Sequence, residues 1–461
     1  MILVIGDIIL DEYWFGSSNR LSPEAVVPVV HIDKKEKRLG GAGNVANNIR
    51  SLGSNVHLIT SFGNDDKGKI LVNLLKDNSI KYTNLSYDKK NTNTKIRIIS
   101  ENNQIVRIDN DNNNKKILLK NIFETNIFKN INRFNLIVIS DYDKGIIKNN
   151  FKKLLNKAIQ KNIPVLIDPK SNDIRKYSKC TLITPNLKEL KKLAFEYEDN
   201  NFFIKKIRKI LKDYQIENIL ITLGKNGMHF INAKESFKLN SINQEVYDVS
   251  GAGDTVISSI AIFLKMGFNL IESIKMSNIS AGLVVNKIGT STTSIDEIYS
   301  FIINQNNDYK FVKDKNYLKI LIQSLKENSK KIVMTNGCFD IIHAGHIKLL
   351  KESKKSGDFL IVAMNTDSSI ANLKGKNRPI NKLIDRIEVI KSLSFVDLIV
   401  TFESKTPLKL YKMILPDVLT KGADYHLKQI VGAKEIVSNG GKVKIINIYK
   451  QLSTTKIYKK I

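Results

Sequence analysis

Short runs of β-branched and apolar residues alternate with amphipathic helical stretches along the whole of this 461-residue chain. Because parallel strands need crossover connections that are usually helices, this alternation predicts an α/β fold with mostly parallel sheets. In the first part of the chain we expect strands at residues 2–5, 56–61, 136–140, 165–167, 181–184 and 219–222. Residues 80–108 break the rhythm with short alternating strands, so we expect them to form a small lid sheet beside a doubly wound main sheet.

A polar segment rich in Asn, Asp and Lys, at residues 304–315, separates this series from a second α/β series. Such a segment is typical of a linker. We therefore expect a first domain at 1–305, a linker with a leading helix at 306–330, and a Rossmann-like second domain at 331–461. Its expected strands include residues 332–335, 359–364, 398–401 and 443–446, and a last helix is expected from about residue 454.

The composition argues against several classes of protein. No uninterrupted apolar run is long enough to span a membrane. The two cysteines, Cys180 and Cys338, lie far apart, which indicates neither a disulfide framework nor a zinc site and fits a reducing cytoplasm. The 73 Lys and Arg residues exceed the 45 Asp and Glu residues, giving a net charge of +28. Because these basic residues are spread over nearly every segment, we expect a solvated surface that attracts anionic substrates, and no nucleic-acid partner.

The sequence Asp-Val-Ser-Gly-Ala-Gly-Asp-Thr at residues 248–255 runs directly into an apolar helical stretch. A glycine-rich turn at a helix start exposes backbone N–H groups at the positive end of the helix dipole, which stabilises an anion. Gly251 and Gly253 let the backbone approach a phosphate closely, because they have no Cβ. Asp254 follows at once, where a base can take a proton from an attacking hydroxyl, although it would also suit a helix cap.

A second glycine cluster, Gly-Gly-Ala-Gly-Asn at residues 40–44, opens a predicted helix. Residues 41–46 match a dinucleotide-binding fingerprint of the G-x-G-x-x-A kind, which leaves an NAD enzyme as an alternative. The match lacks a clean preceding strand, and no acidic residue ends the strand that follows.

Together the two glycine signatures resemble those of the ribokinase-like sugar kinases over residues 1–305. The resemblance implies that the first cluster and an early aspartate hold the sugar, and that Asp254 is the catalytic base. Residues 186–189 resemble the family element that helps to hold Mg²⁺ and the nucleotide phosphates, and Gly224 lies in a loop like the one beside the ATP ribose. The implied sugar-binding residues are Asp11, Gly40, Gly41 and Asn44. The implied ATP-binding residues are Asn186, Leu187, Lys188, Glu189, Gly224, Gly251, Ala252 and Gly253.

In the second domain, the expected strand 332–335 runs into Asn-Gly-Cys-Phe-Asp-Ile-Ile-His-Ala-Gly-His at residues 336–346. His343 and His346 lie three apart at a helix start, and therefore on one side of the helix. Helical metal pairs more often use i, i+4 spacing, and no third ligand is evident among six histidines, so we expect no metal site there. Imidazoles and helix N–H groups instead suit charge that builds on the α-phosphate of ATP.

This stretch resembles the HxGH motif of the cytidylyltransferase-like nucleotidyltransferases, which implies catalytic roles for His343 and His346. A hydroxyl-rich turn opens the expected last helix and resembles the family element that holds the β- and γ-phosphates. The implied nucleotide-binding residues are Gly337, Phe339, Ser453, Thr454 and Thr455.

Both halves also resemble, in the same order, the bifunctional heptose enzymes of lipopolysaccharide core synthesis. Segments that carry this resemblance include Ser-Asp-Tyr at 140–142, Ile-Asp-Pro-Lys at 167–170 and Asn-Thr-Asp at 365–367. The resemblance implies that the first domain transfers the γ-phosphate of ATP to the C1 hydroxyl of D-glycero-β-D-manno-heptose 7-phosphate. The second domain would join AMP from ATP to heptose 1-phosphate, forming ADP-heptose and pyrophosphate.

Lys170, at the end of an expected strand, would bind the distal phosphate of the sugar as a point charge, unless it is an ordinary exposed lysine. The resemblance also implies Mg²⁺ as a cofactor, and we expect a cytoplasmic homodimer. Two further alternatives stay open. One is a kinase–nucleotidyltransferase for another sugar or polyol, and the other is a basic nucleic-acid-binding protein with inactive enzyme domains.

Overall fold

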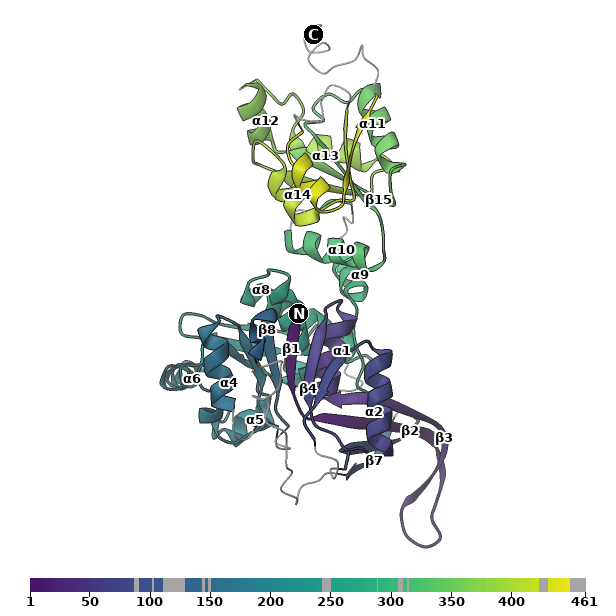
Figure 1. Cartoon of the computed structure of the whole chain (residues 1–461), viewed down its shortest axis with the longest axis vertical. Helices are drawn as coiled ribbons and strands as arrows, with labels where there is room; N and C mark the ends of the chain where they lie inside the picture. Colours follow the sequence, from purple (N-terminus) through teal and green to yellow (C-terminus); the bar gives the residue numbers. More distant parts are fainter. Residues whose placement is uncertain are drawn as a thin grey trace. The chain divides into compact units, whose positions relative to one another are not determined.

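In the computed structural model the chain forms two compact units, Met1–Ser294 and Ile295–Ile461 (Figure 1). The structure describes residues 1–86, 91–101, 103–110, 129–142, 146–147, 151–242, 250–287, 289–305, 310–312, 315–375, 377–422 and 430–447. Across these ranges no helix is both long and apolar enough to cross a membrane. The domain boundaries expected at residues 305 and 330 stay predictions.

The first unit is built on a nine-stranded sheet with the order β13-β12-β11-β10-β9-β8-β1-β4-β5. All six strands expected for this unit lie in its parallel part, and β12 and β13 are an antiparallel edge. The strands are β1 (Ile2–Gly6), β4 (Val56–Thr60), β5 (Lys81–Asn84), β8 (Leu136–Ser140), β9 (Val165–Asp168), β10 (Leu182–Ile183), β11 (Asn218–Thr222), β12 (Met228–Asn232) and β13 (Ser236–Leu239).

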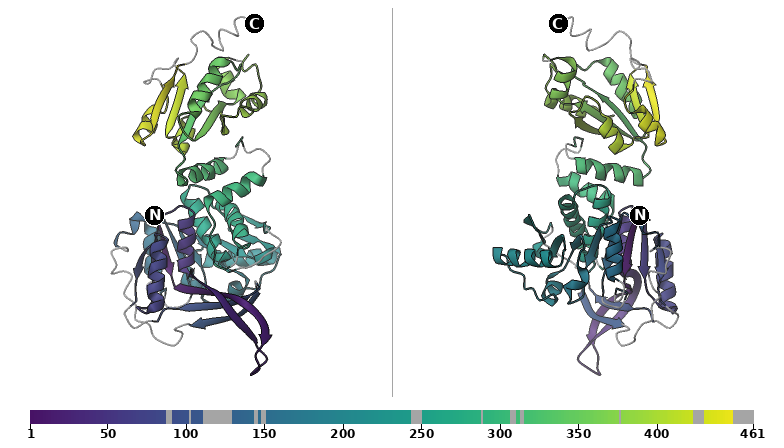
Figure 2. Two further views of the ribbon diagram at one scale, coloured as in Figure 1. Left: turned by 90° about the vertical axis from the view of Figure 1, so that its right-hand side faces the viewer. Right: turned by 60° about the vertical axis from the view of Figure 1, so that its left-hand side comes forward.

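Helices cover both faces of this sheet, so its central strands are continuous apolar runs (Figure 2). Leu3 and Ile5 belong to the same buried cluster as apolar residues of α4 and α6, while α1 and α7 pack on the strands from the other face. The helices of the unit are α1 (Ala42–Ser51), α2 (Asp66–Asp77), α4 (Phe151–Gln160), α5 (Leu187–Lys192), α6 (Asn201–Asp213), α7 (Ala252–Lys265) and α8 (Leu270–Val284).

The lid is a four-stranded sheet with the order β3-β2-β6-β7, and its long β2–β3 hairpin projects from one side of the unit (Figure 1). Its strands are β2 (Ile8–Leu21), β3 (Pro28–Gly41), β6 (Thr94–Ser100) and β7 (Asn103–Asn110). The expected lid of residues 80–108 was therefore wrong in part, because β5 joins the main sheet and residues 8–41 supply half of the lid. The charged outer part of β3 is exposed, so it shows no apolar pattern in the sequence.

The second unit contains a five-stranded parallel sheet with the order β16-β15-β14-β17-β18, which is a Rossmann-like arrangement. Its strands are β14 (Ile332–Gly337), β15 (Phe359–Asn365), β16 (Leu398–Phe402), β17 (Val418–Gly422) and β18 (Lys442–Ile446). Its helices are α9 (Ile295–Gln305), α10 (Lys315–Glu327), α11 (Ala344–Lys354), α12 (Asp367–Lys374), α13 (Leu383–Lys391), α14 (Leu408–Ile414) and α15 (Ala433–Ser438). The expected last helix lies outside the described residues.

The nine-stranded sheet and the five-stranded sheet each have one place where the order of the strands reverses. In the first unit the chain goes from β1 to β4 on one side and later to β8 on the other, and in the second unit β14 is flanked by β15 and β17. Parallel α/β sheets bind ligands at the carboxyl ends of the strands beside such a reversal. These edges are therefore the places to look for active sites.

Candidate active sites

In the first unit, four neighbouring parallel strands place expected functional residues along one edge of the sheet. Tyr142 follows β8, Lys170 follows β9, Asn186 follows β10, and Gly224 follows β11. Because the carboxyl ends of parallel strands meet at one edge, residues far apart in sequence become neighbours there.

Asp254 lies in the first turn of α7 and is only 5% exposed. Its Oδ2 accepts a hydrogen bond of 2.8 Å from Asn44 Nδ2, and its Oδ1 accepts one of 3.3 Å from the Tyr142 hydroxyl. Burial raises the pKa of Asp254 to about 6, against the opposing effects of the Asn44 hydrogen bond and the Lys170 charge. The carboxylate is thus held in place and titrates near neutrality, as a general base should.

No side chain caps the N-terminus of α7 at the glycine turn before Asp254. Gly251 occupies the N-cap position of α7 with a φ of 80°, and no side chain caps the helix there. A Cβ on Gly251 would lie 2.8 Å from Asn44 Nδ2, which holds the base. Open space surrounds the position where Gly253 would carry a Cβ. The first N–H groups of α7 can therefore bind an anion, and Asp254 does not serve as the cap.

Asn186 and Glu189 form a capping box at the start of α5. Glu189 N donates to Asn186 Oδ1 at 3.0 Å, and Asn186 N donates to Glu189 Oε2 at 2.9 Å. The remaining oxygen, Oε1, forms an ion pair with Lys170. Burial opposes the charge on Lys170, but Glu189 and Asp168 outweigh burial and raise its pKa. The element that resembles a nucleotide-binding motif therefore also stabilises the helix start.

The expected sugar-binding residues meet where the lid joins the main sheet. Asp11 forms a buried ion pair of 2.8 Å with Arg97 of β6. Burial raises the pKa of Asp11, and the charge of Arg97 opposes this rise. Gly40 lies directly against the Asp11 carboxylate, where a Cβ would collide, and Gly41 starts α1 with a φ of 58°. Sequence reasoning missed Arg97, because only the pairing of β6 with β2 brings it to Asp11.

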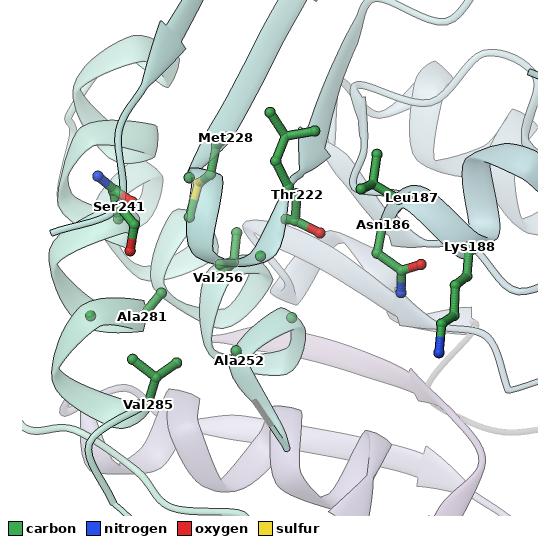
Figure 3. A pocket seen from close by; sticks show the side chains of 16 residues that line it. Asn186, Leu187, Lys188, Thr222, Met228, Ser241, Ala252, Val256, Ala281 and Val285 are labelled. Atoms are coloured by element: carbon green, nitrogen blue, oxygen red, sulfur yellow. The ribbon is translucent and has the colours of Figure 1, made fainter. Parts of the chain in front are cut away.

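A pocket of about 430 Å³ opens beside the glycine turn (Figure 3). Met228, Val256, Ala281 and Val285 form an apolar end, and Lys188 lies with Asn186 at the other end. An apolar end and a polar end beside helix N–H groups suit the base and the phosphates of a nucleotide. Six expected ATP-binding residues line this pocket, namely Asn186, Leu187, Lys188, Gly224, Ala252 and Gly253. Sequence reasoning missed its apolar wall from β12 and α8, because no local pattern distinguishes those residues from core residues.

In the second unit, the HxGH residues lie at the carboxyl end of β14. His343 is the N-cap of α11, and its Nδ1 accepts a hydrogen bond of 3.2 Å from Gly345 N. The neutral ring therefore carries its proton on Nε2, which can donate to a ligand. The centroids of the His343 and His346 rings lie 4.0 Å apart with the rings tilted by 33°, and the Phe339 ring lies 5.3 Å from that of His346. Gly337 packs against Phe339, which itself has a φ of 47°.

Burial favours the neutral form of both histidine rings in this arrangement. Burial lowers the pKa of His343. Burial, together with the charge of Lys374, lowers the pKa of His346 to about 4. His346 Nδ1 is buried without a hydrogen-bond partner in the described part of the chain. A phosphate would supply the missing partner and would favour the charged form of each ring.

Arg386 is a buried residue that organises this site and that sequence reasoning missed. It is 1% exposed and donates to the backbone oxygens of Cys338 at 2.6 Å and Asn365 at 3.0 Å, and to the Asp367 carboxylate at 2.7 Å. It therefore ties together the loops that follow β14 and β15. The available signal was an arginine on the apolar face of α13, between Leu383 and Ile390.

Several predictions from the sequence concern residues or sites that are not part of these two candidate active sites. Ser453, Thr454 and Thr455 are not among the described residues. No cluster of three or more His, Cys, Asp or Glu side chains forms a metal cage within the described ranges. The sequence predicted no clean strand before residues 41–46, whereas β3 runs up to Gly41. That strand pairs antiparallel with β2 in the lid sheet, so it does not form the βαβ unit of a dinucleotide site.

Comparisons with known proteins agree with this geometry. Residues 1–297 match the pfkB family of carbohydrate kinases, and residues 334–460 match the cytidylyltransferase-like family. The first unit resembles phosphofructokinase-2 of Escherichia coli with a TM-score of 0.54 and 18% identity, over 66% of this chain and 98% of that one. It also resembles Arabidopsis thaliana ribokinase, solved with ribose and ATP, with a TM-score of 0.52 and 16% identity, over 65% and 98% of the two chains. These likenesses show a ribokinase-like fold.

The fold and the two sites thus define a bifunctional enzyme, a carbohydrate kinase followed by a nucleotidyltransferase. The bifunctional protein HldE of Histophilus somni is 41% identical over 461 residues, which cover 100% of this chain and 97% of that protein. HldE of Proteus mirabilis is 40% identical over 457 residues, with coverages of 99% and 96%. The chain belongs to the HldE family, so the expected fold class and the resemblance to the bifunctional heptose enzymes are confirmed.

Proposed function

We propose that the first unit phosphorylates D-glycero-β-D-manno-heptose 7-phosphate at its C1 hydroxyl, giving the 1,7-bisphosphate. The second unit transfers AMP from ATP to heptose 1-phosphate, giving ADP-heptose and pyrophosphate for lipopolysaccharide core synthesis. The observation that carries the kinase reaction is the position of Asp254, which Asn44 and Tyr142 hold beside an uncapped glycine turn and a nucleotide-sized pocket.

In the kinase reaction, Asp254 takes the proton of the C1 hydroxyl while that oxygen attacks the γ-phosphorus of ATP. The bond from the γ-phosphorus to its bridging oxygen breaks, and ADP leaves. The N–H groups of the first turn of α7 stabilise the charge on the transferred group. Asp11 and Asn44 hold the sugar, while Asn186, Lys188 and Gly224 hold the nucleotide in the pocket.

Mg²⁺ fits the polar end of the kinase site. Burial and the neighbouring carboxylates of Glu189 and Asp254 raise the pKa of Asp168 well above its usual value. This excess of negative charge is what a divalent cation would neutralise, and proteins commonly hold Mg²⁺ with one or two carboxylates and the substrate phosphates. Asp168 and Glu189 would hold the ion, which when bound would offset charge on the phosphates of ATP.

In the adenylyl transfer, a phosphate oxygen of heptose 1-phosphate attacks the α-phosphorus of ATP, and pyrophosphate leaves. His343 donates from Nε2 and His346 from its ring to the α-phosphate oxygens, which gain charge in the transition state. Gly337 and Phe339 shape the wall beside the nucleotide, and Arg386 positions the loops that carry it. Ser453, Thr454 and Thr455 would hold the β- and γ-phosphates.

The enzyme works in the cytoplasm as a homodimer. Support for a second copy comes from the lid, where large apolar side chains remain exposed at Val26, Val27, Ile105, Val106 and Ile108. Patches of this kind commonly mark protein interfaces. Sedimentation of the purified chain should give the mass of a dimer, and a monomer at all concentrations would contradict this assembly.

Product analysis by mass spectrometry tests both reactions. With ATP and heptose 7-phosphate, we expect heptose 1,7-bisphosphate and ADP. With ATP and heptose 1-phosphate, we expect ADP-heptose and pyrophosphate. A panel of other sugar and polyol phosphates should give far lower kcat/KM values. Preferred turnover of a different sugar would refute the substrate assignment while leaving the two reaction types intact.

A further inference from the structure

Three neighbouring strands of the lid, β2, β6 and β7, place opposite charges side by side on one face. In the register of the strands, Asp11 of β2 lies opposite Lys95 of β6, and Lys95 lies opposite Asp109 of β7. Two positions along β6, Arg97 lies opposite Arg107. Because cross-strand partners and residues two apart share a face, all five side chains belong to the face that contains the sugar-binding aspartate.

Lys95 differs from the two arginines of this face. Arg97 forms an ion pair of 2.8 Å with Asp11, and Arg107 forms one of 2.8 Å with Asp109. Among the residues that the structure describes, Lys95 has no carboxylate within ion-pair distance. Burial lowers the pKa of Lys95, although Asp11 and Asp109 oppose this effect. A half-buried ammonium without a close counter-charge is stabilised by an anionic ligand.

Tyr142 connects this ammonium to the site of phosphoryl transfer. Lys95 Nζ lies 5.6 Å from the centroid of the Tyr142 ring, and the hydroxyl of the same residue donates to Asp254. One phenol side chain therefore separates the cation from the base. A sugar with its C1 hydroxyl at Asp254 and its ring beside Asp11 would extend its far end toward Lys95.

Lys170 is the competing cation, because its Nζ lies 5.3 Å from the centroid of the same ring. It already forms an ion pair with Glu189, and Asp168 adds a second negative charge beside it. Glu189 also caps α5 next to the nucleotide pocket. Lys170 thus stands on the nucleotide side in an ion pair with Glu189, while Lys95 stands on the lid without an ion pair to any carboxylate that the structure describes.

We propose that Lys95 binds the phosphate on the far end of the sugar and makes the kinase select the phosphorylated heptose over the unphosphorylated one. This inference rests on the proposed kinase function and adds the residue that determines its specificity. The sequence alone had pointed to Lys170 for this role.

The test compares the full-length chain with Lys95→Met, Lys95→Arg and Lys170→Met. Isothermal titration calorimetry measures the affinities for heptose 7-phosphate and for heptose with a free 7-hydroxyl, and kinase assays give KM and kcat. Loss of a charge-assisted contact should weaken heptose 7-phosphate binding roughly 10- to 100-fold in Lys95→Met. Affinity for the unphosphorylated sugar and kcat should stay near wild type, and Lys95→Arg should recover most of the loss.

Lys37→Met is the matched control, because Lys37 lies opposite Glu12 and thus on the other face of the lid. It should change neither affinity. Adenylyl transfer by the second unit and the thermal transition report whether each variant folds. The inference is overturned if Lys95→Met leaves the preference for the phosphorylated sugar unchanged, weakens both sugars equally, or if only Lys170→Met removes the preference. If the wild-type chain binds neither sugar, the proposed kinase substrate itself fails.

Discussion

Replacing Asp254 by Asn should abolish the kinase reaction without damaging the site. The Asn side chain is nearly the same size, its oxygen can accept from Asn44, and its amide can donate to the Tyr142 hydroxyl. The variant lacks only the ability to take a proton. Loss of a positioned base commonly costs about 10²–10⁴ in rate, so we expect kinase kcat to fall by that factor with KM for ATP nearly unchanged. Adenylyl transfer should stay at the wild-type rate.

The same substitution should stabilise the first unit at alkaline pH. The pKa of Asp254 rises from 3.8 to about 6 on folding, so the folded state binds the proton more tightly than the unfolded chain. Stability from this group is therefore present at low pH and lost as the pH rises through about 6. Above that value the ionised carboxylate costs the wild type about 3 kcal/mol, which the amide avoids. We expect a higher Tm for the variant at pH 8 and a difference that shrinks toward pH 4.

Coupled assays of ADP release, mass spectrometry of ADP-heptose and calorimetry at several pH values measure these effects. Asp66→Asn is a matched control, because it removes one carboxylate from the exposed start of α2. That variant should keep both activities. Kinase turnover within a factor of about three of wild type in Asp254→Asn would refute the role of base. An equal loss of both activities, with the fold intact, would refute the assignment of separate sites.

Three further outcomes follow from the geometry. His346→Ala should reduce the rate of adenylyl transfer by about 10²–10⁴ and leave the kinase rate unchanged. His343→Asn should have the same effect on both rates, because asparagine can still cap α11. His343→Ala should in addition lower the free energy of unfolding by about 1 kcal/mol in denaturant titrations, because it removes the cap. Gly251→Ala places a Cβ 2.8 Å from Asn44 Nδ2 at a φ of 80°, so kinase kcat/KM should drop at least about tenfold, and an unchanged value would show that the turn is not constrained. Because Asp254 must be ionised to act, kinase kcat/KM should fall as the pH drops through about 6, and a profile that is flat between pH 5 and pH 8 would contradict this role.

The sequence by itself determined those features that local patterns encode. Apolar runs of strand length marked all six expected strands of the parallel main sheet, because strands buried on both faces must be continuously apolar. The glycine turn before Asp254 and the HxGH segment before α11 were readable, because each residue type there is required by the local backbone or by the chemistry of a phosphate. The charged outer part of β3 gave no such signal, since an exposed strand imposes no apolar pattern.

Only the tertiary structure decided which distant residues meet. Arg97 reaches Asp11 through the pairing of β6 with β2, and Asn44 reaches Asp254 because α1 packs on α7. The partner of Lys170 likewise depends on the order of β9 and β10 in the sheet. Such contacts join residues that are many positions apart, and their energies depend on strand register and burial. No local pattern of residues encodes these two quantities, which arise only when the chain packs.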